Sequence, residues 1–142
     1  MKIVYSYYVL DIVHKGHLLM MKNAKAIAGK DGRLIVGILT DKAVMEKKPR
    51  PIVSFEDRIE MARAIKYADL VVAQDTYSPL PNVMKIKPDV LMESTSHDDK
   101  AIKKHENFMK SIGGRVCVIP YYPSCSSTEI KTRIKKNFKL KK

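Results

Sequence analysis

The sequence contains few cysteines, and their spacing does not suggest a crosslinked fold. Cys117 and Cys125 lie eight positions apart with proline between them. This spacing fits neither a disulfide framework nor a CxxC metal site. We therefore expect two free thiols and a reducing, cytoplasmic compartment.

Long hydrophobic runs are also missing. No stretch approaches the roughly 20 consecutive apolar residues of a transmembrane helix, and the first residues, MKIVYSYY, lack the apolar core of a signal peptide. No internal repeat or low-complexity linker interrupts the 142 residues, a length that suffices for one well-buried core. We expect one domain over residues 1–136, followed by a basic tail at residues 137–142.

Acidic residues are too few to balance the basic ones. The chain has 27 Lys and Arg against 15 Asp and Glu, a net charge of +12, and no acidic block. Such an excess predicts an anionic partner: nucleic acid, an anionic membrane surface or small phosphorylated molecules. Much of the excess lies in the last segment, KTRIKKNFKLKK, where it is also typical of a solvated helix end.

Apolar strand patterns alternate with helical patterns along the chain. Strands are predicted at residues 2–10, 33–40, 69–74, 88–93 and 115–120, and helices at residues 16–28, 55–67, 78–86, 98–112 and 127–138. Residues 41–53 are expected to form a loop. The alternation predicts a single-domain α/β fold, a Rossmann-like, doubly wound, five-stranded parallel sheet. In such sheets ligands bind beyond the carboxyl ends of the strands, where the strand order reverses.

Two histidines stand where the first strand meets the first helix. His14 and His17 are three residues apart, so their rings can share one face at the helix end that attracts anions. A positive helix terminus disfavours imidazolium, so both rings are expected to be neutral and to donate an N–H to phosphate oxygens. Gly16 between them leaves the backbone open to a ligand. The alternative is a capping pair without a ligand; zinc fits less well, because no nearby Cys or carboxylate completes a ligand set.

These residues resemble a known family. LDIVHKGH resembles the HxGH signature of the nucleotidylyltransferase superfamily, and within it of the cytidylyltransferases. LTDKAVMEKKPRPIVSFEDR is similar to the corresponding stretch of glycerol-3-phosphate cytidylyltransferases, and YYPSCSSTEI occupies the place of their closing motif. PSCSST also resembles the loop of cytidylyltransferase domains from phosphonate pathways. The three motifs occur in the family's order at the ends of predicted strands.

The resemblance implies an enzyme that transfers CMP from CTP, accompanied by Mg²⁺, to a small phosphorylated alcohol or phosphonate and releases pyrophosphate. It further implies a nucleotidylyltransferase domain at residues 1–136 and a homodimer, without nucleic acid or stable membrane insertion. The implied catalytic residues are His14, His17 and Lys47; the nucleotide-binding residues are Val9, Leu10, Gly16, Lys48, Arg58, Tyr121, Ser126, Ser127 and Thr128; the substrate-binding residues are Asp11, Glu93 and His97. No metal-binding side chain is implied.

The chain departs from the family pattern at three places. Tyr8, Val9 and Leu10 replace a Gly-Thr-Phe, Tyr121 replaces an arginine, and Glu93 with Ser94 replaces a Gly-Asp pair. These positions concern which nucleotide base and which acceptor substrate the protein would bind. One alternative is therefore an adenylyltransferase acting on a phosphorylated cofactor precursor, such as a flavin or pantetheine. A second alternative is a non-enzymatic, basic nucleic-acid-binding module.

Several of these residues also have a purely structural interpretation. Ser126 or Ser127 is equally typical of a helix N-cap, Lys47 and Lys48 of solvated surface charges, and Arg58 of a helix-surface residue. His97 and His105 are expected at the surface, with His97 close enough to the fourth strand to reach a substrate. Met20, Met21 and Met61 are expected in the core.

Overall fold

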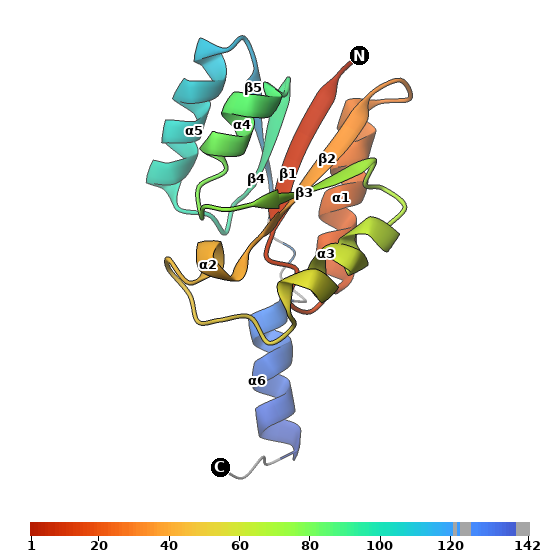
Figure 1. The fold of residues 1–142 in the computed structure, drawn as a ribbon, viewed down its shortest axis with the longest axis vertical. Helices are drawn as coiled ribbons and strands as arrows, with labels where there is room; N and C mark the ends of the chain where they lie inside the picture. The colour runs from red at the N-terminus through yellow and green to blue at the C-terminus, as the bar shows by residue number, and fades with distance from the viewer. Residues whose placement is uncertain (121, 123–125, 139–142) are drawn as a thin grey trace.

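Five parallel strands form the centre of the protein. The computed structural model describes residues 1–120, 122 and 126–138 (Figure 1). The strands are β1 (Ile3–Tyr8), β2 (Arg33–Leu39), β3 (Leu70–Gln74), β4 (Val90–Ser94) and β5 (Arg115–Ile119). They pair in the order β3-β2-β1-β4-β5, and every pairing is parallel. The predicted doubly wound α/β fold is confirmed.

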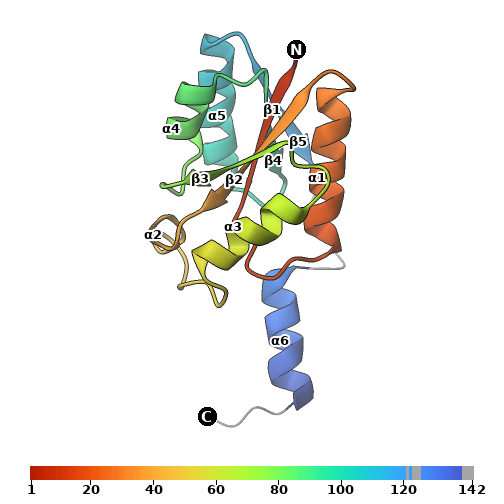
Figure 2. The same cartoon turned by 45° about the vertical axis from the view of Figure 1, so that its right-hand side comes forward.

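Helices cover both faces of this sheet. They are α1 (Lys15–Ala28), α2 (Asp41–Val44), α3 (Phe55–Ala64), α4 (Leu80–Ile86), α5 (Asp99–Ser111) and α6 (Ser127–Phe138). Helices α1 and α3 lie on one face and α4 and α5 on the other, while α6 extends away from the sheet (Figures 1 and 2). Sequence analysis missed α2, a single turn that starts where the Thr40 hydroxyl accepts a hydrogen bond from the Ala43 N–H.

Alternate residues of β1 face the two helical layers. Val4 packs with Met21 and Ala24 of α1, whereas Tyr5 packs with Val83 of α4 and Met109 of α5. Successive strand side chains point to opposite faces, so a strand covered on both sides must be apolar on both. This requirement explains the continuous apolar runs that mark the central strands in the sequence.

The methionine expectations are confirmed only in part. Met21 is fully buried, but Met61 of α3 has half of its surface exposed, so the expectation that it belongs to the core is wrong. Cys117 is a free thiol, as expected, and Cys125 lies outside the described residues. None of the helices described here is both long and apolar enough to span a bilayer.

The strand order reverses between β1 and β4. From β1 the chain proceeds through α1 to β2 on one side, whereas β4 and β5 lie on the other side of β1. The connections after β1 and β4 therefore diverge at the carboxyl ends of these strands, which is where ligands bind in such sheets. His14 and His17 follow β1 at this edge, and His97 follows β4.

Gly37 tests the packing of the central strands. A Cβ at this position of β2 would lie 2.0 Å from the Tyr5 hydroxyl, which donates a 2.6 Å hydrogen bond to Gln74 Oε1. Because the ring is fully buried, it has no free space to move into. We expect Gly37→Ala to lower the free energy of unfolding by about 1–3 kcal/mol, the usual cost of overpacking a core. Urea denaturation measures this; an unchanged midpoint would contradict the rigid packing of Tyr5.

Candidate functional site

The two histidines after β1 cap helix α1 and each other. His14 is the N-cap residue, and its Nδ1 accepts a hydrogen bond from the Gly16 N–H at 3.1 Å. His17 Nδ1 accepts from the His14 N–H at 3.3 Å, which completes a reciprocal capping box. The ring centroids lie 3.8 Å apart. The predicted meeting of the two rings is confirmed, and so is their capping role.

The capping bonds determine which ring nitrogens carry protons. Burial lowers the pKa of His17 to about 3, with a further contribution from His14, and burial also lowers the pKa of His14. Both rings are therefore neutral at pH 7, as predicted, although the main cause is desolvation rather than the helix terminus. Since each Nδ1 accepts a backbone N–H, each neutral ring carries its proton on Nε2. Two adjacent Nε2–H donors result.

The backbone around this pair is largely engaged by the protein itself. The Gly16 N–H donates to His14, and the Val9 carbonyl accepts from Arg58 at 2.7 Å. Leu10 is buried and has a φ of 61°, a left-handed conformation that is uncommon for a branched residue. The connection between β1 and α1 is therefore shaped by the three residues that were predicted to contact a nucleotide, Val9, Leu10 and Gly16.

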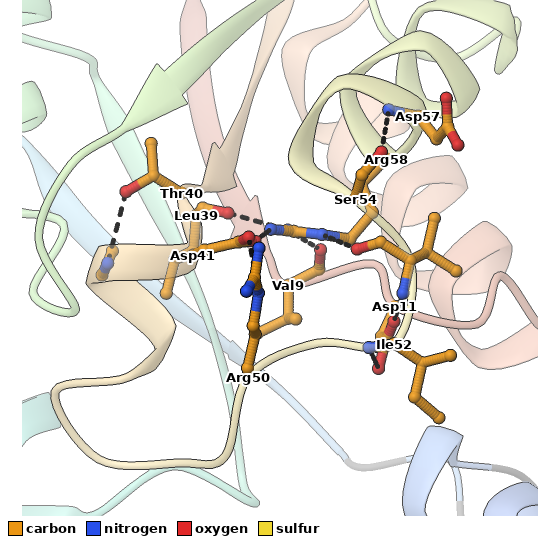
Figure 3. Close-up of polar contacts among 12 residues, drawn as sticks. Val9, Asp11, Leu39, Thr40, Asp41, Arg50, Ile52, Ser54, Asp57 and Arg58 are labelled. Carbon is orange, nitrogen blue, oxygen red and sulfur yellow. Dashed lines mark hydrogen bonds and ion pairs between the residues drawn. The ribbon is translucent and has the colours of Figure 1, made fainter.

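Asp11 connects three segments at the end of β1. Its carboxylate accepts hydrogen bonds from the Ile52 and Val53 N–H groups at 3.0 and 2.8 Å (Figure 3). Lys131 of α6 donates to the same carboxylate at 2.5 Å. Burial alone would raise the pKa of Asp11, but the Lys131 contact and the two N–H groups keep it below its usual value. The predicted substrate residue is thus an ionised anchor for protein groups.

Sequence analysis did not single out Lys131. It follows Ser127 by four residues, one helical turn along α6. Its position one turn after the serine motif, on the same helix, is the sequence feature that could have identified it.

Arg58 is fully buried although it was expected either at a nucleotide or on a helix surface. Its guanidinium donates to the carbonyls of Val9 and Leu39 at 2.7 Å each, to the Val53 carbonyl at 3.1 Å, and to Asp41 Oδ1 at 2.7 Å (Figure 3). The surface interpretation is wrong, because these partners lie beneath α3 and take up the side chain. Arg58 joins the ends of β1 and β2 to the segment before α3.

A second buried charge lies beside β1 at the end of β4. Glu93 is fully buried and accepts from the Tyr7 hydroxyl at 2.8 and 3.0 Å, from His105 Nδ1 at 2.6 Å and from His97. Burial would raise the pKa of Glu93, but the His105 and His97 contacts hold it below its usual value. The expectation that His105 lies at the surface is wrong, because its ring is buried against this carboxylate.

His97 differs from the rest of this cluster in its exposure. One third of its side chain is exposed, and its ring stacks on Tyr7 with centroids 5.6 Å apart. Sequence analysis overlooked Tyr7 and did not recognise His105 as a partner of Glu93, although these two residues hold Glu93 from β1 and α5. Only the tyrosine-rich pattern of β1 hinted at a polar role for Tyr7.

The remaining predicted residues lie in the segment after α2 and at the start of α6. Lys47 and Lys48 follow α2, and the Lys47 ammonium lies 5.1 Å from the centroid of the Tyr77 ring. Ser126 caps α6, because its hydroxyl accepts the Glu129 N–H at 3.0 Å, and the Ser127 hydroxyl donates to the Ile12 carbonyl at 3.1 Å.

The structure therefore brings some of the predicted residues together and leaves others apart. The Ser127 contact and the Lys131 contact join the start of α6 to the segment that carries the histidine pair. Thr128 is exposed, and Tyr121 lies outside the described residues. Within residues 1–120, 122 and 126–138, no group of three His, Cys, Asp or Glu side chains is arranged to hold a metal ion.

Replacing Arg58 by lysine tests the buried guanidinium. A single ammonium cannot reach four acceptors, so at least one buried carbonyl loses its partner. We expect Arg58→Lys to lower the free energy of unfolding by about 1–3 kcal/mol. Arg50→Lys is the matched control, because Arg50 contacts the same Asp41 at 3.4 Å with three quarters of its side chain exposed; it should cost less than about 0.5 kcal/mol. Equal effects in urea denaturation would contradict the role given to Arg58.

The lowered pKa of His17 predicts how stability depends on pH. Between the unfolded value near 6.5 and the folded value of about 3, the unfolded chain binds more protons, so acidification favours unfolding. The free energy of unfolding should therefore fall as the pH decreases from 7 to 5. His17→Gln keeps an N3 capping acceptor but cannot titrate, so its unfolding free energy should fall less over the same range. Parallel slopes for both proteins would contradict this assignment.

The sequence matches a known family and several known proteins. A family profile described as cytidylyltransferase-like matches residues 9–133. The chain is 34% identical over 136 residues to the bifunctional protein HldE of Alcanivorax borkumensis, covering 94% of this chain and 28% of that protein. It is 31% identical over 132 residues to an FAD synthase of Korarchaeum cryptofilum, covering 90% of this chain and 88% of that enzyme.

A solved structure also resembles this chain. A lipopolysaccharide core biosynthesis protein from Thermoplasma volcanium has the same fold, with a TM-score of 0.71, 22% identity, and coverage of 86% of this chain and 97% of that one. The chain spans only about a quarter of the HldE proteins, 26 to 28% of their length. The chain belongs to the cytidylyltransferase-like family of the nucleotidylyltransferase superfamily.

Proposed function

We propose that this protein transfers a nucleotidyl group from a Mg²⁺-bound nucleoside triphosphate to the phosphate of a small acceptor and releases pyrophosphate. The observation that carries the proposal is the neutral, mutually capped histidine pair with two Nε2–H donors at the reversal point of the sheet. It occurs in a chain whose family profile is cytidylyltransferase-like. The net charge of +12 suits substrates that are both polyanions.

The reaction requires positioning and charge stabilisation rather than a protein nucleophile. An acceptor phosphate oxygen attacks the α-phosphorus, a new P–O bond forms, and the bond to the β-phosphate breaks so that pyrophosphate leaves. Negative charge builds on the phosphate oxygens in the transition state. His14 and His17 would donate Nε2–H hydrogen bonds to these oxygens while both rings stay neutral.

Three further groups complete the proposed site. Lys47 and Lys48 would neutralise the triphosphate from the segment after α2, whose far end Asp11 holds through Ile52 and Val53. The start of α6, with Ser126, Ser127 and Thr128, would bind the departing phosphates through hydroxyl and N–H groups. Mg²⁺ would arrive with the triphosphate and be held mainly by phosphate oxygens and water.

Arg58 and Glu93 act through other groups in this proposal. The Arg58 guanidinium positions the ends of β1 and β2 and the segment before α3 through its hydrogen bonds to three carbonyls and Asp41. Glu93 orients His97, the partly exposed member of its cluster, which is the side chain proposed to contact the acceptor. A small phosphorylated alcohol or phosphonate fits such a site.

The donor base distinguishes two candidate functions. The resemblance of the sequence motifs to cytidylyltransferases favours CTP. The similarity to an FAD synthase, which by its name makes an adenine dinucleotide and of which 88% is covered, favours ATP and a phosphorylated cofactor precursor as acceptor. Both candidates use the same histidine pair and the same leaving group.

A pyrophosphate-release screen tests the proposal. Each of the four ribonucleoside triphosphates is combined with Mg²⁺ and with glycerol phosphate, phosphocholine, inositol phosphate, hydroxyethylphosphonate, aminoethylphosphonate, FMN or phosphopantetheine. Release that requires one nucleotide and one acceptor is expected, and its base preference decides between CTP and ATP. A folded protein that releases no pyrophosphate with any pair contradicts the proposal and favours the nucleic-acid-binding alternative.

His17→Ala tests the histidine pair with the best pair of substrates. Loss of one donor to developing charge should lower kcat by about 10² or more, while circular dichroism shows an unchanged fold. Lys22→Ala, an exposed change further along α1, is the control and should retain kcat. Near-native kcat in a folded His17→Ala protein would remove His17 from the reaction.

A further inference from the structure

Three hydrogen-bond donors converge on Glu93, the buried carboxylate at the end of β4. They are the Tyr7 hydroxyl, His105 Nδ1 and His97 Nδ1. Burial raises the pKa of Glu93, but the His105 and His97 contacts together outweigh burial and hold this pKa below its usual value. The carboxylate is therefore ionised at pH 7 and can only accept hydrogen bonds. The hydrogen between Glu93 and His97 thus belongs to Nδ1 of the ring.

A weaker contact competes for the same ring nitrogen. The Ser94 N–H lies 3.3 Å from His97 Nδ1, and Nδ1 cannot accept this hydrogen while it donates its own to Glu93. Hydrogen bonds to an ionised partner are roughly twice as strong as those between neutral groups. The bond to Glu93 therefore determines the tautomer.

The opposite nitrogen of the His97 ring is free to bind a ligand. Within the described part of the chain no group hydrogen-bonds Nε2, and no side-chain nitrogen that lacks a partner is buried, so Nε2 reaches solvent. With the hydrogen on Nδ1, the neutral ring has its lone pair at Nε2. This polarity is the reverse of that at His14 and His17, whose Nδ1 atoms accept backbone N–H groups.

His97 and the His14–His17 pair lie on opposite sides of β1. Tyr8 packs in the core layer shared with α1, and its ring meets the His17 ring edge-on with centroids 5.9 Å apart. Tyr7, the preceding residue, packs in the layer shared with α4 and α5 and stacks on His97. Successive strand side chains point to opposite faces. A ligand that crosses the end of β1 would therefore meet two N–H donors on one side and a lone pair on the other.

The groups around His97 can accommodate a second ring proton. An imidazolium formed by protonation at Nε2 would keep its Nδ1–H bond to the ionised Glu93. Tyr7 remains a protonated hydroxyl, because burial and then Glu93 raise its pKa. His105 is bound to the other carboxylate oxygen, and Asp98, the next residue in the chain, is exposed. Among the described residues, the ionised group bound to the ring is thus an anion.

We propose that His97 is a proton acceptor in the transfer reaction, and that its Nε2 takes the proton of a phosphate or phosphonate monoanion bound as the acceptor substrate. The O–H bond of the monoanion breaks, its proton moves to Nε2, and the electron pair stays on the oxygen. That oxygen, now part of a dianion, attacks the α-phosphorus while the bond to the β-phosphate breaks and pyrophosphate leaves. The imidazolium returns its proton to water after the products leave. This inference rests on the proposed function, because it needs a phosphorylated acceptor.

A phosphonate would depend on this proton transfer more than a phosphate ester. A phosphate ester has a second pKa near 6 and is mainly a dianion at pH 7. A phosphonate has carbon in place of the ester oxygen, and because carbon withdraws fewer electrons, the second proton is held more tightly. More of the phosphonate is therefore in the less nucleophilic monoanionic form. We expect the phosphonates in the acceptor panel to need His97 most.

The pH dependence of turnover distinguishes a proton acceptor from a structural histidine. At pH 5 a phosphate ester is only about one tenth dianionic, so His97→Gln should lower kcat about tenfold for such an acceptor and more for a phosphonate. At pH 8.5 the dianion predominates, and kcat should be close to native. Lys103→Gln, which removes an exposed charge from α5, is the control and should match the native protein at both pH values. With circular dichroism confirming the fold, an equal His97→Gln effect at both pH values contradicts the proposal.

The ionisation of a bound phosphonate tests the same role without turnover. Methylphosphonate is added to the protein at pH 6, and its ³¹P NMR shift distinguishes bound monoanion from bound dianion. We expect the dianion on the native protein and the monoanion on His97→Gln. Glu93→Gln is a second variant that keeps the ring, because its amide N–H can donate to Nδ1 and leave the ring proton on Nε2. The monoanion is expected there too.

A native protein that binds methylphosphonate as the monoanion, or does not bind it, overturns the proposal. A dianion that persists in both variants overturns it as well. These outcomes are independent of the pyrophosphate-release screen. A protein that releases no pyrophosphate but binds methylphosphonate as a dianion only when His97 and Glu93 are intact would contradict the proposed function and confirm proton uptake by His97.

Discussion

The arrangement of chain segments at the carboxyl ends of the strands depends on the buried guanidinium of Arg58. A charge in the interior is costly unless its hydrogen bonds are satisfied. Here they are satisfied by the carbonyls of Val9, Leu39 and Val53 and by Asp41. These acceptors belong to segments that are well separated in sequence. One planar group donates hydrogen bonds to all of them. It therefore fixes the ends of β1 and β2 and the segment before α3 relative to one another.

Asp11 extends this arrangement to the parts expected to move or to bind. Its carboxylate holds the Ile52 and Val53 N–H groups and the Lys131 ammonium, so the lysine-bearing segment and α6 meet at one anion. Ion pairs of this kind contribute less to net stability than apolar packing does. Their effect here is geometric, since they bring three chain segments to the histidine pair.

The histidine pair shows why imidazole, rather than a hydroxyl or a carboxylate, begins α1. Ser or Asp would cap the helix equally well through oxygen. A neutral histidine caps with Nδ1 and still keeps an Nε2–H donor. Burial maintains the neutral form at pH 7, as the lowered pKa values of His14 and His17 indicate. The same two residues thus complete the helix start and present uncharged N–H donors, which the proposed function assigns to phosphate.

Features with local causes could be predicted from the sequence. Strand and helix order follows from hydrophobic periodicity, and the His14–His17 capping depends on four consecutive residues, so both were identified. The distant contacts could not be. The Arg58 bond to Val9 joins residues 49 positions apart, and the Lys131 bond to Asp11 spans 120.

The misplaced residues have the same origin. The burial of His105 against Glu93 and the exposure of Met61 depend on which element lies across from each side chain. The identity of a charged or apolar residue is the same in the sequence whether folding leaves its side chain in solvent or buries it. The sequence by itself therefore determined the sheet, the order of its elements and the capped histidines. Only the tertiary structure decided which charges are buried and paired, because that pairing requires partners brought together by folding.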